Sequence, residues 1–412
     1  MSWETLLDRP EFLLRRRGRH LVAELREAHQ VLSTSVTNGG QTAHVRFLLN
    51  HQSCEGAGHL EVHRVITEIG YPAYHARVCE EASVQPDATA MMGTAANMHY
   101  AAIVTEADED VEVTAVVTAG VEGNATCAGD PANWRETDAG MEKVPAYAGT
   151  INTMLLVNRP LTVSALARAA MTMTEGKSAG LQRLAVPSRQ SADLATGTGT
   201  DQYCIAAPAR AEGVRTSTSP HVKLGELIGR AVRQATQEAL RWQNGLEPSY
   251  TRGVFHALAR YGVKEATFFD DIAPYLDAPN LELLRKNIKA VMYEPLVGAA
   301  AHALATVLDR VRHGSLPVSI QRDAAVQHAA TLATSVAAKP EAWPEYRLRL
   351  HQWGQTPVKE GLTFWRGVVP LRACEESSPR CSRCLPSRAP PPRSASPAPS
   401  SPPATRSGLP PT

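Results

Sequence analysis

The sequence predicts an α/β fold, a mixed sheet with flanking helices, followed by a helical region and a disordered C-terminal tail. Short β-branched runs alternate with amphipathic segments over residues 15–243, which is typical of an α/β domain. Strand signals almost vanish over 245–370. Residues 372–412 hold eleven of the 29 prolines and show no periodic apolar face. We therefore expect three parts with these boundaries.

The strands of the first part are predicted from short runs rich in β-branched residues and bounded by turn residues. Residues 29–37 and 42–49 flank Asn38-Gly39-Gly40. An Asn-Gly pair between two such runs indicates a hairpin, because both turn residues adopt positive φ. Further strands are expected at 111–119, 150–158 and 202–207.

Helices are predicted where apolar residues recur at spacings of three and four. In the first part they cover residues 162–184, with Thr162 as the N-cap, and 224–243. The second part consists of helices separated by prolines. These are expected at residues 250–261, 281–293, 297–313 and 322–338.

The tail cannot bury enough apolar surface to offset its chain entropy, so we expect it to be disordered. It contains Cys374, Cys381 and Cys384, and the last two have the C-x-x-C spacing. A zinc knuckle needs four ligands, and no further Cys or His follows. Incidental cysteines are the favoured interpretation, and deletion of the tail should leave folding and activity nearly unchanged.

Charge and hydropathy exclude several classes of protein. The 412 residues include 42 Lys and Arg and 41 Asp and Glu, a formal net charge of +1. A nucleic-acid binder that neutralises phosphates should be clearly basic, so no nucleic-acid partner is expected. No apolar run approaches the roughly 20 residues of a membrane span. Phe12-Leu13-Leu14 precedes Arg15-Arg16-Arg17, the reverse of a secretory signal, which favours the cytoplasm.

Single, scattered cysteines argue against a disulfide framework in a reducing compartment. Buried, inert thiols are the favoured interpretation for Cys54, Cys79, Cys127 and Cys204. The sequence has no H-E-x-x-H motif and no compact His/Asp cluster, so no catalytic metal is expected and chelators should not abolish activity. It also lacks the G-x-S-x-G elbow of α/β-hydrolases.

Five short segments of small and polar residues stand out. They are LSTSVTNGG (32–40) with Asn50 downstream, VTAG (117–120) with GNA (123–125) and AGDP (128–131), GTIN (149–152), TEGK (174–177) and ATGTGTD (195–201). The glycine-rich segments have neither the Gly-Lys-Ser/Thr end of a P-loop nor the spacing of a dinucleotide fold.

Taken in this order, with the helix that begins near His221, these segments resemble the adenosylcobinamide amidohydrolase (CbiZ) family over about residues 20–243. The resemblance implies a corrinoid-salvage enzyme. Such an enzyme hydrolyses the amide between the corrin ring and the aminopropanol arm of adenosylcobinamide, and the acid re-enters coenzyme B12 synthesis. The corrinoid is then a substrate, and no cofactor is expected. Gly176 departs from the family pattern, which has alanine there, and this should loosen the helix slightly.

Two other functions stay open. One is a corrinoid-binding protein that retains the pocket without the hydrolysis, and the other is an amidohydrolase of a different small amide. The oligomeric state and the role of residues 245–370 are also open.

Amide hydrolysis needs an activated nucleophile, an acid for the leaving amine and donors for the oxyanion. The candidate catalytic residues are Asp201, Glu175, Lys177 and Asn152. Asp201 closes a run of small residues, although an Asp there can equally tighten a turn. Glu175 and Lys177 lie two apart on a helix and point to different sides, so a solvated face is the alternative. The amide of Asn152 or Asn50 can donate to a carbonyl or an oxyanion; turn formation is the alternative for both and the favoured one for Asn50.

The candidate substrate-binding residues are small or polar and lie at the ends of strand-like runs. They are Asn38, Gly39, Gly40, Asn50, Thr150 and Thr198. His51 should point to the face opposite Asn50 and is a weaker base candidate. A hydroxyl nucleophile among Ser33, Thr34, Ser35 and Thr37 stays open.

Small residues would let backbone amides reach a flat, amide-rimmed corrin. We expect these segments to converge on one cleft, with Asp201 and Asn152 facing each other across it and Glu175 near its wall. The alternative is a set of separate turns.

Overall fold

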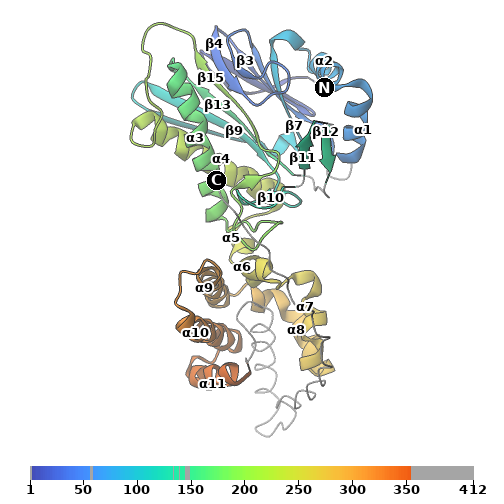
Figure 1. Ribbon diagram of the computed structural model, residues 1–412, viewed down its shortest axis with the longest axis vertical. Coiled ribbons are helices and arrows are strands. Elements are labelled where there is room, and N and C mark those ends of the chain that lie inside the picture. The colour runs from blue at the N-terminus through green and yellow to red at the C-terminus, as the bar shows by residue number, and fades with distance from the viewer. Residues whose placement is uncertain (1, 56–58, 133, 139, 144–148, 354–412) are drawn as a thin grey trace, which may run out of the picture.

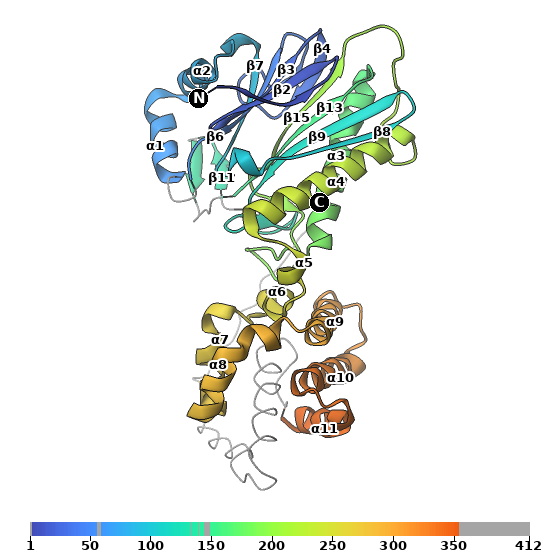
Figure 2. The same cartoon turned by 180° about the vertical axis from the view of Figure 1, so that it is seen from behind.

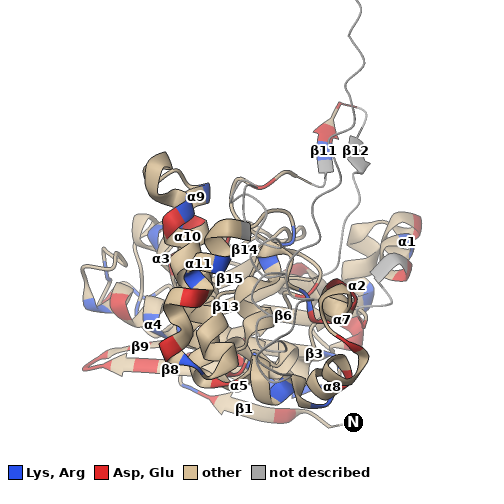
Figure 3. Ribbon diagram, turned by 90° about the horizontal axis from the view of Figure 1, so that it is seen from below, with Lys and Arg blue, Asp and Glu red and all other residues tan. Residues whose placement is uncertain are grey.

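The computed structural model describes residues 2–55, 59–132, 134–138, 140–143 and 149–353. The expected tail at 372–412, with Cys374, Cys381 and Cys384, lies outside these residues. Figures 1 and 2 show two stacked β-sheets with helices on their outer faces, and a separate group of helices below them. Figure 3 shows basic and acidic residues interspersed over the helices, in keeping with the small net charge.

The first sheet has five strands in the order β1-β2-β3-β6-β7. All neighbours are antiparallel except β6 and β7, which are parallel. Helix α2 packs on its outer face through Tyr74 and Val78, and α1 packs there through Val62 and Ile66. The bounds are β1 Glu4–Asp8, β2 Phe12–Arg17, β3 His20–Leu25, β6 Phe47–Gln52, β7 Thr89–Thr94, α1 His59–Ile69 and α2 Tyr71–Glu81.

The second sheet has six strands in the order β5-β4-β15-β13-β9-β8. Its central strands β13 and β15 are parallel, and all other neighbours are antiparallel. Helices α3 and α4 cover its outer face. The bounds are β4 His29–Ser33, β5 Gly40–Thr42, β8 Ala102–Asp108, β9 Val111–Ala119, β13 Ile151–Val157, β15 Gln202–Pro208, α3 Val163–Arg183 and α4 Lys223–Asn244.

The expected α/β class with mixed sheets is therefore confirmed, but the strands form two sheets instead of one. Two small antiparallel pairs complete this part, and the pair β11–β12 stands away from the body (Figure 3). Their bounds are β10 Ala125–Thr126, β14 Gly197–Thr198, β11 Trp134–Thr137 and β12 Gly140–Lys143.

The four layers are held by separate cores. Strand β13 is buried along its whole length because it contributes to two of them. Ile151 and Leu155 pack under α3 and α4, whereas Met154 and Leu156 pack between the sheets. This alternation follows from the two-residue period of a strand and determines which face each polar residue at the strand end reaches.

The expected hairpin around Asn38 is only partly correct. Strand β4 ends at Ser33 and pairs with β5 from Gly40, so the loop covers residues 34–39 instead of a two-residue turn. The expected strand at 42–49 is therefore divided: β5 ends at Thr42, and the chain crosses to the other sheet, where β6 begins at Phe47. The Asn38 amide donates to Pro86 O and Thr89 O, both at 2.9 Å, and these contacts to the first sheet fix the wider loop.

Helices α3 and α4 cross at glycines. Thr162 is the N-cap of α3, as expected, and its hydroxyl accepts from the Ala165 amide at 3.2 Å. A Cβ at Gly176 would lie 2.9 Å from Gly229 O on α4, closer than real side chains approach. The glycine that departs from the family pattern thus permits a close contact between the two helices.

The described residues beyond 247 form helices around a core of their own, which includes Phe268, Met292 and Tyr346. Helices α8, α9 and α10 begin two to four residues before their expected starts, the first two with a proline in the first turn. Helices α7 and α11 were not expected. The bounds are α5 Pro248–Thr251, α6 Val254–Leu258, α7 Glu265–Ile272, α8 Ala278–Met292, α9 Pro295–Arg312, α10 Val318–Ala337 and α11 Trp343–Trp353.

Among the described residues, no single helix combines the length and hydropathy needed to cross a bilayer. The pair α8 and α9, bent by 79°, meets those two requirements together.

Candidate functional site

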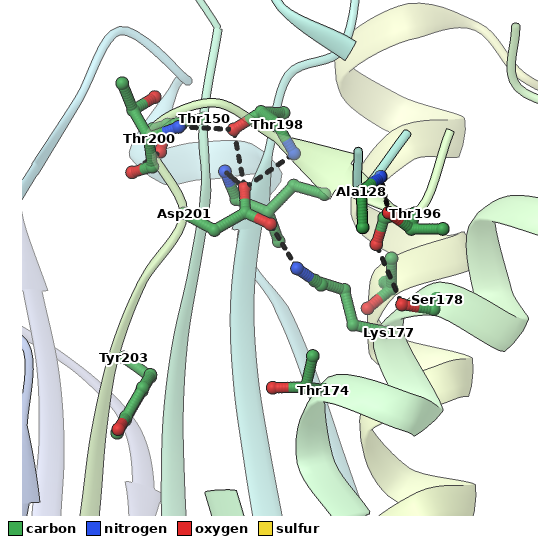
Figure 4. Close-up of polar contacts among 12 residues, drawn as sticks. Ala128, Thr150, Thr174, Lys177, Ser178, Thr196, Thr198, Thr200, Asp201 and Tyr203 are labelled. Atoms are coloured by element: carbon green, nitrogen blue, oxygen red, sulfur yellow. Dashed lines mark hydrogen bonds and ion pairs between the residues drawn. The ribbon is translucent and has the colours of Figure 1, made fainter. Parts of the chain in front are cut away.

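Asp201 lies directly before β15, and its carboxylate is held from several directions (Figure 4). Its Oδ1 accepts hydrogen bonds from the backbone amides of Ile151 and Thr198, both at 3.1 Å, and from the Thr198 hydroxyl at 2.5 Å. Its Oδ2 accepts an ion-paired hydrogen bond from Lys177 Nζ on α3. The Asp201 and Lys177 side chains are 19% and 13% exposed, so solvent still reaches the pair.

Gly197 makes room for this ion pair. A Cβ at this position would overlap Asp201 Oδ2 and lie 2.6 Å from Lys177 Nζ. Gly197 is held in place by the short ladder between β14 and β10, in which it pairs with Thr126. The small residues of ATGTGTD therefore do two things: they let the charged side chains approach, and they allow the turn that Thr198 closes onto Asp201.

Hydroxyl and amide groups tie the GTIN segment to the same turn. The Thr150 hydroxyl donates to Thr200 O at 2.7 Å, and the Thr200 hydroxyl donates to Gly149 O at 2.8 Å. The Asn124 amide also donates to Gly149 O, at 3.0 Å. Thr150 and Thr198 thus lie beside Asp201, as expected, and both form internal hydrogen bonds that hold the loop.

Asn152 and Asn50 form a second cluster, buried between the two sheets. The Asn152 amide donates to Asn50 Oδ1 at 2.9 Å and to Gly93 O at 3.1 Å, and the Asn50 amide donates to Thr118 Oγ1 at 2.8 Å. The two asparagines are 0% and 2% exposed. This network links the ends of β6, β7, β9 and β13.

The expectation that Asp201 and Asn152 face each other across one cleft is wrong. Asp201 binds the Ile151 amide and reaches Lys177 on the helix side of the sheet, whereas Asn152 reaches the opposite sheet. The two residues are close along adjacent strands, but successive side chains of a strand point to opposite faces.

Asn38, Gly39 and Gly40 shape the loop between β4 and β5. A Cβ at Gly39 would overlap the Ser35 carbonyl oxygen, and Gly40 has a φ of 74°. Asn38 binds Thr89 at the start of β7, while Asn152 binds Gly93 near its end. Thr89 and Gly93 are four residues apart on β7, so at roughly 3.3 Å per strand residue the two contacts lie about 13 Å apart.

Glu175 is exposed on α3 and makes no hydrogen bond or ion pair with any residue that the structure describes. The structure therefore brings Lys177, Thr198 and Thr150 to Asp201 and leaves Glu175 in solvent.

Tyr203 and Thr174 lie near the ion pair and were not expected there (Figure 4). Tyr203 follows Asp201 by two residues, so the strand period could have placed it on the same face. It is half-buried, and burial raises the pKa of its phenol. Thr174 is exposed three residues before Lys177 on α3, the spacing of neighbours on one helix face.

His51 points away from this site. It faces α2, stacks on His20 with ring centroids 5.0 Å apart, and contacts the Tyr74 ring. Burial lowers its pKa to about 3, so the ring is neutral at ordinary pH. The side chains of His51 and Asn50 point to opposite faces of β6, as the sequence indicated.

Cys204 and Cys79 are poor candidates for a nucleophile. Burial raises the pKa of the Cys204 thiol to about 12 and that of Cys79 to about 11, which leaves little thiolate. Within the described ranges, no group of three or more His, Cys, Asp or Glu side chains is arranged to hold a metal ion.

Residues 4–248 match the family model described as adenosylcobinamide amidohydrolase (CbiZ). The chain belongs to this family. The matched region runs from the start of β1 to just after α4. Membership in the CbiZ family implies a hydrolase.

One relative is an uncharacterized protein of Methanocaldococcus jannaschii, which is 34% identical over 186 residues, 43% of this chain and 72% of that protein. Among solved structures, the PH0078 protein of Pyrococcus horikoshii is similar at 16% identity and a TM-score of 0.27, covering 58% of this chain and 82% of that one. This second likeness is too weak to add to the assignment.

Proposed function

We propose that this CbiZ-family protein hydrolyses the amide that joins the aminopropanol arm to the corrin ring of adenosylcobinamide. The products are adenosylcobyric acid and 1-amino-2-propanol, and the acid can re-enter coenzyme B12 synthesis. The observation that carries the proposal is the family match over residues 4–248, which contains the whole Asp201–Lys177 site. The corrinoid is the substrate, and the proposal requires no cofactor.

The ion pair supplies groups suited to amide hydrolysis. Oδ1 of Asp201 already accepts three hydrogen bonds, so Oδ2 is the oxygen that takes a proton from an attacking water. The Lys177 ammonium then lies beside the carbonyl oxygen of the substrate amide, on which negative charge develops as water attacks. The C–N bond breaks as the proton passes from Asp201 to the leaving nitrogen. The new carboxylic acid then gives its proton to the amine, so the corrin side chain is left as a carboxylate and aminopropanol as an ammonium ion.

A flat substrate has a surface to lie on beside this pair. Leu32 and Tyr203 pack on the helix side of the second sheet but remain half-exposed, and Thr34 next to them is exposed. Thr174 of α3 lies across from Tyr203 (Figure 4). We propose that the corrin ring rests on this strip, with its amide-bearing rim toward Lys177.

Incubation with adenosylcobinamide, followed by mass spectrometry of both products, tests the proposal. The wild-type protein should release acid and amine in equal amounts. Asp201→Asn and Lys177→Met should each lower the rate by about 10²–10⁴-fold, the usual contribution of acid–base groups. Lys286→Met removes a lysine from an exposed i,i+4 pair on α8 and is the matched control, with an unchanged rate.

Two results would overturn the proposal. Tight binding without product would identify a corrinoid-binding protein, and the absence of both binding and product would point to another amide substrate. Cyanocobinamide in parallel shows whether the adenosyl group is needed.

A further inference from the structure

The helical region contacts the family domain at the loop formed by residues 184–194, which runs from the end of α3 to the Asp201 segment. His256 Nε2 donates to Leu184 O at 2.6 Å, and Arg260 Nη1 donates to Ala192 O at 2.9 Å. His313 Nε2 lies 2.9 Å from Asp193 Oδ1. Figure 1 shows α6 at the junction between the two parts. The contacts come from α6, the turn that follows it, and the end of α9.

Arg260 is held rigidly in this junction. Its guanidinium makes two hydrogen bonds to the Asp309 carboxylate, and the Tyr261 hydroxyl donates to the same carboxylate at 2.5 Å. The Arg260 side chain is only 7% exposed. A planar guanidinium fixed on a carboxylate presents its remaining donors in a defined direction, here toward Ala192 O. The Ala192 carbonyl therefore receives a pre-positioned donor.

Hydrogen bonds joined by short stretches of backbone connect this loop to the Asp201 carboxylate. The Ser188 amide donates to Asp193 O at 2.9 Å, and the Ser188 hydroxyl donates to Asp130 Oδ2 at 2.6 Å. Asp130 in turn accepts from the Cys127 amide at 2.7 Å, directly after β10. Strand β10 pairs with β14, whose Thr198 binds Asp201.

We propose that the helical region is an intramolecular clamp on the 184–194 loop, and that Arg260 is a positioning residue for Thr198 and Asp201. By fixing Ala192, Arg260 keeps the loop seated so that β14 stays paired with β10 and the carboxylate stays aligned with Lys177. The effect on turnover rests on the proposed function, whereas the effect on the loop does not.

Hydrogen exchange measured by mass spectrometry tests the clamp without any substrate. Arg260→Met should speed exchange of the amides in 186–198 by about tenfold or more. In this variant the loop can open without first breaking the hydrogen bond from Arg260 to Ala192 O. Arg260→Met combined with Asp309→Asn should do the same without leaving a partly buried carboxylate that has lost its ion-pair partner. Arg322→Met is the matched control, because Arg322 also donates to a backbone carbonyl, His351 O at 2.7 Å, but within the helical region.

Turnover of adenosylcobinamide gives the second readout. Both Arg260 variants should lower kcat by about tenfold with little change in KM, because Arg260 acts on the alignment of Asp201 and not on binding. Arg260→Lys should recover part of the rate, since it keeps the ion pair with Asp309.

Unchanged exchange at 186–198 in the folded double variant would overturn the clamp. Faster exchange with normal kcat would overturn the positioning role. If the wild-type protein does not hydrolyse adenosylcobinamide, the proposed function and the positioning role fail, while the exchange result still decides the clamp.

Discussion

Lys177 on α3 and Asp201 at the start of β15 form an ion pair across the helix–sheet interface, although 24 residues separate them in the chain. The pair depends on a glycine at 197 and on three hydrogen bonds to the other carboxylate oxygen. These contacts fix the positions of both side chains, so the ion pair is not a chance surface contact.

Gly197→Ala should impair catalysis without unfolding the protein. The added methyl group would overlap Asp201 Oδ2 and crowd Lys177 Nζ, and both atoms are side-chain ends that can move apart. We expect kcat for adenosylcobinamide to fall by at least about tenfold, because small displacements of reacting groups are costly. Thermal unfolding should change by only a few degrees. Normal kcat in a folded Gly197→Ala protein would show that the close approach is unimportant.

Gly176→Ala and Gly229→Ala should change stability in opposite directions, although both add one methyl group to a helix interior. At Gly176 the methyl group would press on Gly229 O, and forced separation of packed elements typically costs about 1–3 kcal/mol. At Gly229 a Cβ meets nothing within 4 Å, so the gain in helix propensity of about 0.5–1 kcal/mol should dominate. Urea unfolding measures both free energies. Equal effects would mean that the α3–α4 contact is looser than described.

Asn152→Ala should destabilise the fold. It removes the donor that serves Asn50 Oδ1 and Gly93 O between the sheets. Gly93 O keeps the Gln202 amide at 3.3 Å, whereas Asn50 Oδ1 loses its donor, and a buried polar group left unsatisfied costs about 1–3 kcal/mol. Asn287→Ala removes an exposed amide that donates to Leu283 O and should change the free energy of unfolding by less than about 0.5 kcal/mol. If Asn152→Ala lost activity but kept full stability, Asn152 would contact the substrate instead.

His51 should contribute to acid sensitivity. Burial lowers its pKa from 6.5 to about 3 in the folded protein, so between these values the unfolded chain binds a proton that the folded chain does not. The stability that depends on neutral His51 is complete above about pH 6.5 and is lost as the pH falls toward 3, by up to about 1.4 kcal/mol per pH unit.

His51→Phe keeps a ring against His20 and removes this titration. Urea unfolding across that pH range should therefore show a shallower loss of stability than in the wild type. His99→Phe, an exposed histidine, is the control. Identical pH profiles for His51→Phe and the wild type would contradict the burial of a neutral His51.

The central strands and long helices could be predicted because their local pattern agrees with their environment. Strand β9 lies at the predicted 111–119, and α3 and α4 end within one residue of prediction. The first sheet was largely missed. Strand β2 reads FLLRRR, which resembles a charge run, but Phe12 and Leu14 are buried in the core and Arg15 and Arg16 pair with Glu24 and Glu4 on the neighbouring strands. Such cross-strand pairs are invisible to local periodicity.

The grouping of residues around Asp201 could be predicted from the sequence, but the sheet face that each side chain reaches could not. Asp201, Lys177, Thr150 and Thr198 could be selected from motif segments, and they do meet. Which sheet Asn152 would reach depends on a second sheet that the sequence pattern did not reveal. The role of Gly197 also depends on a tertiary approach of Lys177 that no spacing rule contains.

The most direct test of the central claim is the reaction of adenosylcobinamide in heavy-oxygen water, with mass spectrometry of both products. Hydrolysis of the amide predicts one heavy oxygen in the new carboxylate of adenosylcobyric acid and none in 1-amino-2-propanol. The amount of labelled acid formed should depend on the intact ion pair and should fall with the rate in Lys177→Met. No labelled acid, or heavy oxygen in the aminopropanol hydroxyl, would contradict amide hydrolysis at this site.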